Sequence, residues 1–216
     1  KTMDELLERW SKSIQFQVMS RYLSLLESEE ASQKAKAKKG DDEKVVEKNE
    51  AEKEKEIVNY GFNRHKNLHY KVLSMDTETG ACSLKVKFES GYKLPPGMSY
   101  AELEMFVVSG SITYGDTTYG DGYYFLIPPG VSMPEMRVKK GAVVIMFYNY
   151  GEPSFIPSDE DHPLAERFRL SIVDSMKDIN WMPGNRIVPS VASGCMLKPL
   201  KYDPDTEAHT FLYCMT

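Results

Sequence analysis

Hydrophobic and polar positions follow three different patterns along the chain, and the first of them is helical. Between residues 3 and 28, apolar side chains recur at spacings of three and four, which is typical of an amphipathic helix. Thr2 followed by Glu5 forms a capping box at its start. We therefore expect an amphipathic helix within residues 1–28, packed either on its own domain or on a partner protein. The apolar seam that a partner would contact consists of Leu6, Leu7, Trp10, Ile14, Val18, Tyr22 and Leu25.

The second pattern covers residues 29–60, where most positions are charged or small. Gly40, Asp41 and Asp42 break this run into two halves. A lysine cluster in the first half is nearly cancelled by neighbouring acids. The second half, Glu43–Val58, mixes acidic and basic residues at helical spacing. We expect a charged linker that is partly helical.

The third pattern begins near residue 66, where short apolar runs alternate with turn residues. Asp76–Gly80 separates the first two runs, and glycine or proline follows several of the others. Closely spaced strands with almost no helical pattern predict a mainly β sandwich or barrel. The expected strands include residues 68–75, 81–88, 105–108, 111–114, 123–127 and 142–148.

The overall charge and the cysteines limit the class of protein. The 216 residues carry a formal net charge of −5, which argues against an electrostatic nucleic-acid interface. No apolar run approaches the roughly 20 residues that span a bilayer, so we expect no membrane-spanning segment. Cys82, Cys195 and Cys214 have no metal or redox spacing, which favours a reducing intracellular compartment. The chain begins at Lys1, so an organelle interior, reached after removal of a targeting peptide, is a second candidate location.

Two segments of the β-rich part carry a family resemblance. Gly122, Pro128 and Gly130 are spaced as in the second motif of the cupins, and Pro95–Gly97 with Glu104–Gly110 is similar to the first motif. The resemblance implies a cupin jelly-roll barrel over residues 61–158, preceded by the helical extension. Fold class is therefore expected to be mainly β.

Residues 159–216 resemble the opening of a second cupin unit. Trp181, Pro183, Lys198–Leu200 and the run that begins at Asp203 carry this similarity. The chain as a whole is similar to the first unit of two-unit cupins, such as the anti-sigma-factor cupins. We expect residues 159–216 to form a C-terminal extension whose strands cover a sheet edge.

The resemblance also implies a metal site that this chain lacks in part. Metal-binding cupins supply two histidines and a glutamate from the first motif and a histidine from the second. Here the first-motif window contains no histidine, and Met133 stands at the second-motif position. Glu102 and Glu104 are the remaining carboxylates, and one carboxylate holds a transition metal poorly against water. We expect no metal, no other cofactor and no catalytic residues.

Methionines and aromatic residues indicate an apolar barrel interior. This interior is either packed shut or forms a pocket for a small apolar ligand, because methionine adapts to irregular space. The candidate lining residues are Met98, Tyr100, Met105, Met133, Met136 and Phe147.

Three functions compete at this level. The favoured hypothesis is a non-catalytic, structural or assembly subunit of a larger protein complex, with an organellar respiratory or photosynthetic complex as one candidate host. The second is a metal-dependent dioxygenase, isomerase or lyase with an atypical site. The third is a small apolar-ligand binding module. Other protein subunits are the expected partners of the N-terminal helix.

Overall fold

A computed structural model describes residues 67–187, 194–203 and 208–215. The helix expected within residues 1–28 and the linker of residues 29–60 lie outside these ranges. Within the described ranges, no helix is both long and apolar enough to cross a membrane.

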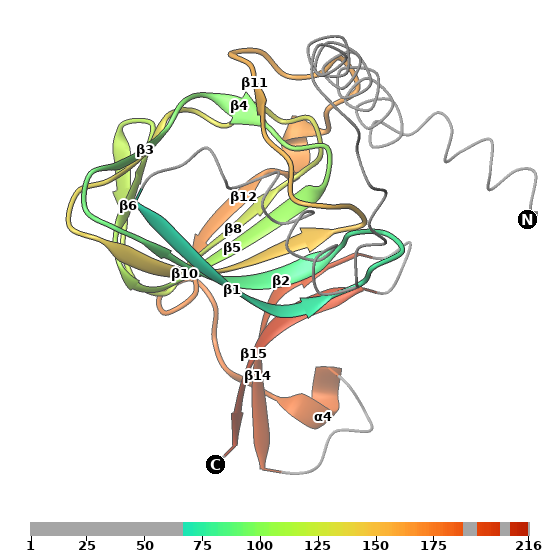
Figure 1. Cartoon of the computed structure of the whole chain (residues 1–216). Helices are drawn as coiled ribbons and strands as arrows, with labels where there is room; N and C mark the ends of the chain where they lie inside the picture. The colour runs from blue at the N-terminus through green and yellow to red at the C-terminus, as the bar shows by residue number, and fades with distance from the viewer. Residues whose placement is uncertain (1–66, 188–193, 204–207, 216) are drawn as a thin grey trace, which may run out of the picture.

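Two antiparallel sheets face each other across the apolar interior (Figure 1). The larger sheet has the strand order β1-β2-β10-β5-β8-β12 and the smaller one β3-β9-β6-β7. The larger sheet contains β1 (Leu68–Met75), β2 (Cys82–Phe88), β10 (Ala142–Asn149), β5 (Glu102–Gly110), β8 (Tyr123–Ile127) and β12 (Ser171–Asp174). The smaller sheet contains β3 (Tyr92–Leu94), β9 (Met136–Val138), β6 (Ile112–Tyr114) and β7 (Thr117–Tyr119).

A pair of two-residue strands joins the barrel at one end. β4 (Gly97–Met98) pairs with β11 (Ile156–Pro157). Gly97 also bridges to Met133, with N–H to O distances of 3.1 and 2.7 Å in the two directions. The segments that carry the two family motifs are therefore hydrogen-bonded to each other. A Cβ at position 97 would lie 2.4 Å from the Phe155 ring, so this close approach requires glycine.

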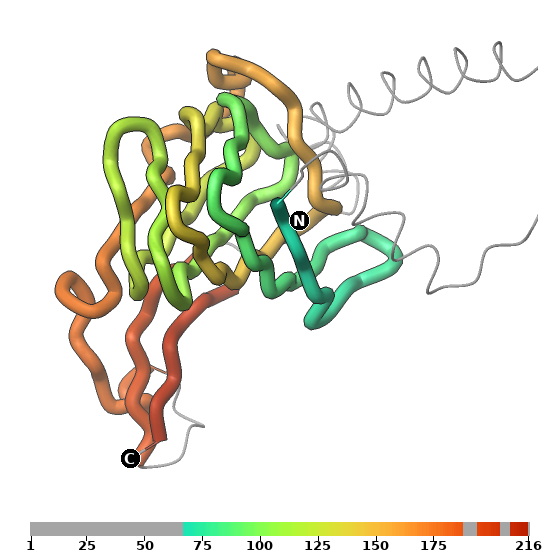
Figure 2. The backbone as a smooth tube through the Cα atoms, turned by 60° about the vertical axis from the view of Figure 1, so that its left-hand side comes forward, coloured from blue at the N-terminus to red at the C-terminus, as the bar shows by residue number. Residues whose placement is uncertain are grey.

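The C-terminal part forms a third sheet outside the barrel (Figure 2). It contains β13 (Met182–Pro183), β14 (Cys195–Tyr202) and β15 (His209–Met215), with the short helix α4 (Gly184–Ile187) beside them. The 3₁₀ turn η1 (Arg167–Arg169) lies earlier, before β12. β12 pairs with β8, so the barrel sheet takes its last strand from beyond residue 158.

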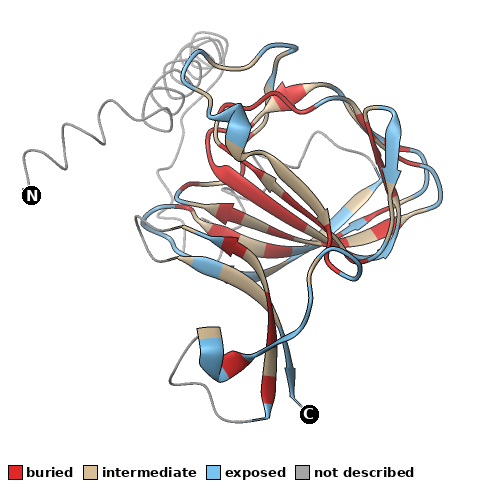
Figure 3. Cartoon of the chain, turned by 180° about the vertical axis from the view of Figure 1, so that it is seen from behind, coloured by how far each residue is buried: buried red, intermediate tan, exposed pale blue. Residues whose placement is uncertain are grey.

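Strand alternation explains the core. In β2 and β10 every second residue is buried, as expected for strands with one face on an apolar interior. Leu84, Val86, Val107 and Val144 are fully buried in this core, and Figure 3 shows buried strands running through the middle of the larger sheet. The prediction of a mainly β fold is confirmed for the described residues.

An ion pair fastens the loop after β11 to the turn before β9. The Ser132 amide donates to Asp161 Oδ1 at 2.8 Å, and Arg167 donates to Asp161 and to the Ser132 carbonyl. Hydrogen bonding from Arg167, with the Ser132 amide, lowers the pKa of the Asp161 carboxyl. Because the folded pKa is lowered, this contribution to stability is present above the unfolded pKa near 4 and is lost as pH falls through the folded value.

These contacts predict that protonation of Asp161 at acidic pH frees the loop after β11 from the turn before β9. We expect hydrogen-exchange protection of the Ser132 amide to persist from pH 6 to pH 4 and to fall only at more acidic pH, once Asp161 is protonated below its lowered pKa. An Asp161→Asn variant keeps an acceptor oxygen but carries no charge for Arg167, so its protection is expected to be lower than that of the wild type at pH 6 and independent of pH. Protection of the Asp161→Asn variant equal to that of the wild type at pH 6 would contradict the assignment.

Candidate functional site

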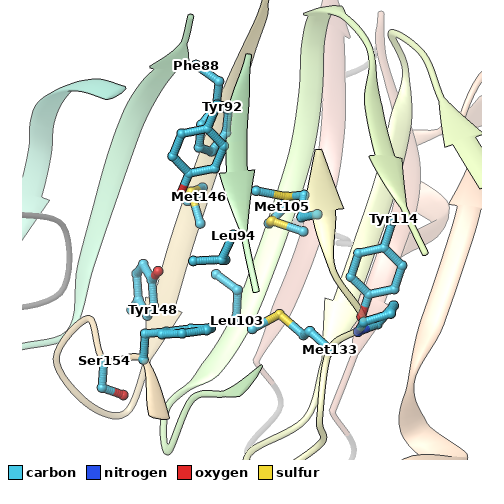
Figure 4. Close-up of a pocket in the computed structure, with 13 residues that line it drawn as sticks. Phe88, Tyr92, Leu94, Leu103, Met105, Tyr114, Met133, Met146, Tyr148 and Ser154 are labelled. Atoms are coloured by element: carbon cyan, nitrogen blue, oxygen red, sulfur yellow. The ribbon is translucent and has the colours of Figure 1, made fainter. Parts of the chain in front are cut away.

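The barrel encloses a small apolar cavity between the two sheets. Its volume is about 40 Å³. Figure 4 shows Leu103, Met105 and Met133 directed toward the same space. The lining consists of Phe88, Tyr92, Leu94, Leu103, Met105, Tyr114, Met133, Pro134, Met136, Met146, Tyr148, Ser154 and Phe155.

The structure brings together only part of the predicted lining. Met105, Met133 and Met136 line the cavity. Met98, Tyr100 and Phe147 are not among the lining side chains. Phe147 pairs with Glu104 across β10 and β5, on the opposite face of the sheet from Met146 and Tyr148.

The two glutamates proposed as remaining carboxylates do not lie beside Met133. Leu103 and Met105 of β5 point into the barrel, so Glu102 and Glu104 point out of it by the two-residue repeat of a strand. The sequence interpretation grouped them with Met133, but the pleat separates them. Among the described residues, no aspartate, glutamate, histidine or cysteine lines the cavity.

A metal centre of the kind found in cupins does not fit this donor set. Across residues 67–187, 194–203 and 208–215, no three His, Cys, Asp or Glu side chains are arranged to hold a metal ion. The cavity instead offers thioethers, phenols and a serine hydroxyl, which are poor ligands for Fe, Mn, Ni or Zn. His69, for example, lies on the surface 3.7 Å from Glu89.

One polar atom in the cavity wall has no hydrogen-bond partner among the residues that the structure describes. The Tyr114 hydroxyl is buried and makes no hydrogen bond within the described part of the chain. Burial raises the pKa of this phenol, so it remains a neutral donor at physiological pH. A buried hydroxyl of this kind costs free energy unless it donates to water or to a small acceptor. The cavity has room for about one to three waters.

The outward-facing glutamates belong to a buried polar network on the other side of the sheet. Lys201 of β14 donates to both Glu102 and Glu104. Asn149 uses its amide Nδ2 for the same two carboxylates, at 3.0 and 2.6 Å. The Tyr124 hydroxyl donates to Glu104 Oε2 at 2.7 Å. These contacts hold the C-terminal hairpin against the outer face of the sheet.

The electrostatics of this network are balanced. Burial alone would lower the pKa of Lys201, but its contacts with Glu102 and Glu104 raise it. Burial and the adjacent Glu104 raise the pKa of Tyr124. Arg169 adds a second cation, 3.2 Å from Glu102. Two carboxylates therefore meet two cations in this network.

Sequence reasoning missed this network. The available signal was the alternation of Glu102 and Glu104 with the apolar residues Leu103 and Met105. Carboxylates on the outer face of an inner strand need hydrogen-bond or ion-pair partners if another element covers that face. Lys201 lies 97 residues from Glu104 and 99 from Glu102, and no local pattern links them. Only the packing of the hairpin on the sheet reveals the partner.

Comparison with known proteins places the chain in a family. Residues 48–214 match the family described as "Domain of unknown function (DUF4437)". No curated protein matches the sequence. Many solved structures match the chain.

A proposed dioxygenase from Nostoc punctiforme PCC 73102 is 23% identical with a TM-score of 0.63, over 73% of this chain and 55% of that one. A proposed glyoxylate-induced protein from Pseudomonas aeruginosa is 17% identical with a TM-score of 0.44, over 69% and 55%. A protein of cupin-like fold from Ralstonia eutropha JMP134 is 18% identical with a TM-score of 0.38, over 47% and 68%. This chain spans about half the length of the first two. The protein has the cupin fold and belongs to the DUF4437 family.

Proposed function

We propose that this protein is a non-catalytic cupin that acts as a structural or assembly subunit of a larger protein complex. The observation that carries the proposal is the lining of the barrel cavity. It includes Leu103, Met105 and Met133, and within the described part of the chain it contains no imidazole or carboxylate. A cavity of about 40 Å³ with this lining packs the barrel and leaves little space for a substrate. The barrel then serves as a rigid scaffold for its surfaces.

Exposed apolar side chains on the C-terminal hairpin support a role in contacts with other chains. Tyr202, Tyr213 and Met215 are 66%, 46% and 76% exposed. These side chains are spread along the hairpin, and each is a candidate contact with another chain. The apolar seam of residues 6–25 remains the second candidate contact and lies outside the described residues.

Metal analysis tests the non-catalytic part of this proposal. We expect the purified full chain, incubated with Fe²⁺, Mn²⁺, Ni²⁺ or Zn²⁺ and desalted, to retain far less than one equivalent by mass spectrometry. A Met133→His variant places a strong ligand at the same position and shows whether the barrel alone can gain a metal. One tightly held equivalent in the wild type that is lost on Met133→Ala would overturn the proposal.

The subunit role can be tested by native gel electrophoresis of an extract of the source cells, which measures the mass of the complex that contains this protein. The tagged full chain is expected to migrate in a complex larger than its own oligomer. A Trp10→Glu, Ile14→Glu variant is expected to leave that complex while keeping the thermal midpoint of the barrel. Migration of the wild type at the mass of the isolated protein would contradict the subunit role.

A dioxygenase is the second candidate function. Its support is the fold shared with the proposed dioxygenase from Nostoc punctiforme. Oxygen uptake with a metal-loaded wild-type chain, absent from the Met133→Ala variant, would favour it. The apolar-ligand alternative has less support, because this cavity is much smaller than the roughly 150 Å³ of an engineered cavity that binds benzene.

A further inference from the structure

A second pocket lies between the barrel and the C-terminal hairpin, on the outer face of the larger sheet. Its volume is about 390 Å³, which is in the usual range for small-molecule sites. The barrel contributes Glu104, Asn149 and Tyr150, and the turn after β1 contributes Asp76 and Thr79. The hairpin closes the pocket with Lys201, Ala208, His209 and Thr210.

The floor of this pocket is a rigid set of buried polar groups. The side chains of Lys201 and Glu104 are only 4% and 3% exposed. Asn149 directs both of its amide N–H bonds to Glu102 and Glu104, which leaves its amide oxygen as an acceptor. Lys201 has three N–H donors and uses two on the glutamates. The floor therefore offers both a donor and an acceptor to a ligand.

The charges of the pocket disfavour an anion. Lys201 and Arg169 balance Glu102 and Glu104 at the floor, so no surplus cation remains there for a phosphate. Asp76 adds a further carboxylate to the wall. Asp76 accepts hydrogen bonds from the Glu78 amide and the Thr79 hydroxyl at 2.9 and 2.7 Å. A ligand that both donates and accepts hydrogen bonds without carrying charge suits these walls.

Tyr150 at the rim is held in an unusual backbone conformation. Its φ is 65°, in the left-handed region that a bulky residue rarely adopts. Its ring lies over Lys201, with Nζ 5.9 Å from the ring centroid, and the residue is 45% exposed. Strain kept at a rim residue is typical of a functional position, because asparagine or glycine would relieve it. An aromatic ring there can pack against the C–H face of a ligand.

We propose that this pocket binds a small, neutral, hydroxyl-rich molecule of monosaccharide or polyol size. Lys201 and Asn149 hydrogen-bond its hydroxyl groups, Asp76 binds its far side, and Tyr150 packs on its carbon face. The site is separate from the barrel cavity and does not depend on whether the protein is a subunit of a complex.

Calorimetry on the full chain tests this site with defined probes. The panel is D-glucose, D-galactose, D-mannose, myo-inositol and glycerol, with inorganic phosphate and choline as charged probes. We expect saturable binding of at least one neutral probe. Tyr150→Asn should weaken it at least tenfold, with an unchanged or higher thermal midpoint because asparagine tolerates φ of 65°.

Two variants separate binding from folding. Phe168→Asn removes an exposed ring that does not line the pocket and should leave affinity unchanged. Asp76→Asn keeps the size of the side chain, replaces one acceptor oxygen of the pocket wall with a donor and should weaken binding. Failure of all neutral probes, tighter binding of phosphate or choline, or full affinity in the Tyr150→Asn variant would overturn the proposal.

Discussion

Replacement of Lys201 by methionine is expected to destabilise the protein by about 3 kcal/mol or more. Methionine keeps most of the length of the side chain but removes its charge. The substitution leaves Glu102 and Glu104 buried with only Asn149, Tyr124 and Arg169 to satisfy them. Removing one partner of a buried ion pair costs more than the pair contributes, because an uncompensated charge remains in a low-dielectric site. Urea unfolding monitored by tryptophan fluorescence and circular dichroism gives the difference.

A matched lysine and a rescue variant make this result specific. Lys177 pairs with Asp174 on the surface and is 80% exposed, so Lys177→Met should change stability little. Lys201→Met combined with Glu102→Gln and Glu104→Gln removes the unpaired charges and should recover part of the loss. A loss below about 1 kcal/mol for Lys201→Met alone would show that the pair is solvated in solution.

Alanine at Gly110 is expected to cost about 2–5 kcal/mol. Gly110 ends β5 with φ of 83° and pairs with Ala142 of β10. A Cβ there would lie 2.3 Å from the Gly141 carbonyl oxygen and 2.9 Å from the Ala142 Cα. Both neighbours are backbone atoms, so neither can move without disturbing the ladder. The strain of the left-handed conformation and the steric overlap of the Cβ therefore both contribute to the expected loss of stability.

Gly91 provides the matched control for this substitution. Its φ is also 83°, but a Cβ there would meet no atom within 4 Å. Gly91→Ala should lower the free energy of unfolding only by the cost of placing alanine in the left-handed conformation, about 1 kcal/mol. Denaturant unfolding of both variants separates the two contributions. Equal losses at the two positions would show that the β5–β10 contact is not sterically tight.

The two motif segments illustrate how far local sequence carries the fold. Gly122 has a φ of 85° and Gly130 a φ of 72°. Glycine adopts this left-handed conformation without steric strain, so the backbone of the two turns explains why glycine stands at these positions of the motif. Strand positions follow from apolar alternation, and the predicted runs at 68–75, 123–127 and 142–148 match β1, β8 and most of β10. The run at 105–108 found only the middle of β5, because Glu102 and Glu104 interrupt its apolar pattern.

The candidate site was less predictable than the fold. Met133 was identified as an inward residue from its motif position, and it lines the cavity. Tyr114 and Met146 were not identified, because their strands carry no motif and their direction depends on register. Glu104 was assigned to the barrel interior, but its neighbours Leu103 and Met105 occupy that face.

The sequence by itself determined the β-rich pattern, the left-handed glycines of the turns, and the methionine at position 133, because each depends on residues close together in the chain. The tertiary structure alone decided that Glu104 meets Lys201, that Gly97 bridges Met133, and that a polar pocket forms beneath the C-terminal hairpin. Each of these depends on which strands pair and in which register, and that choice comes from burying the whole core at once.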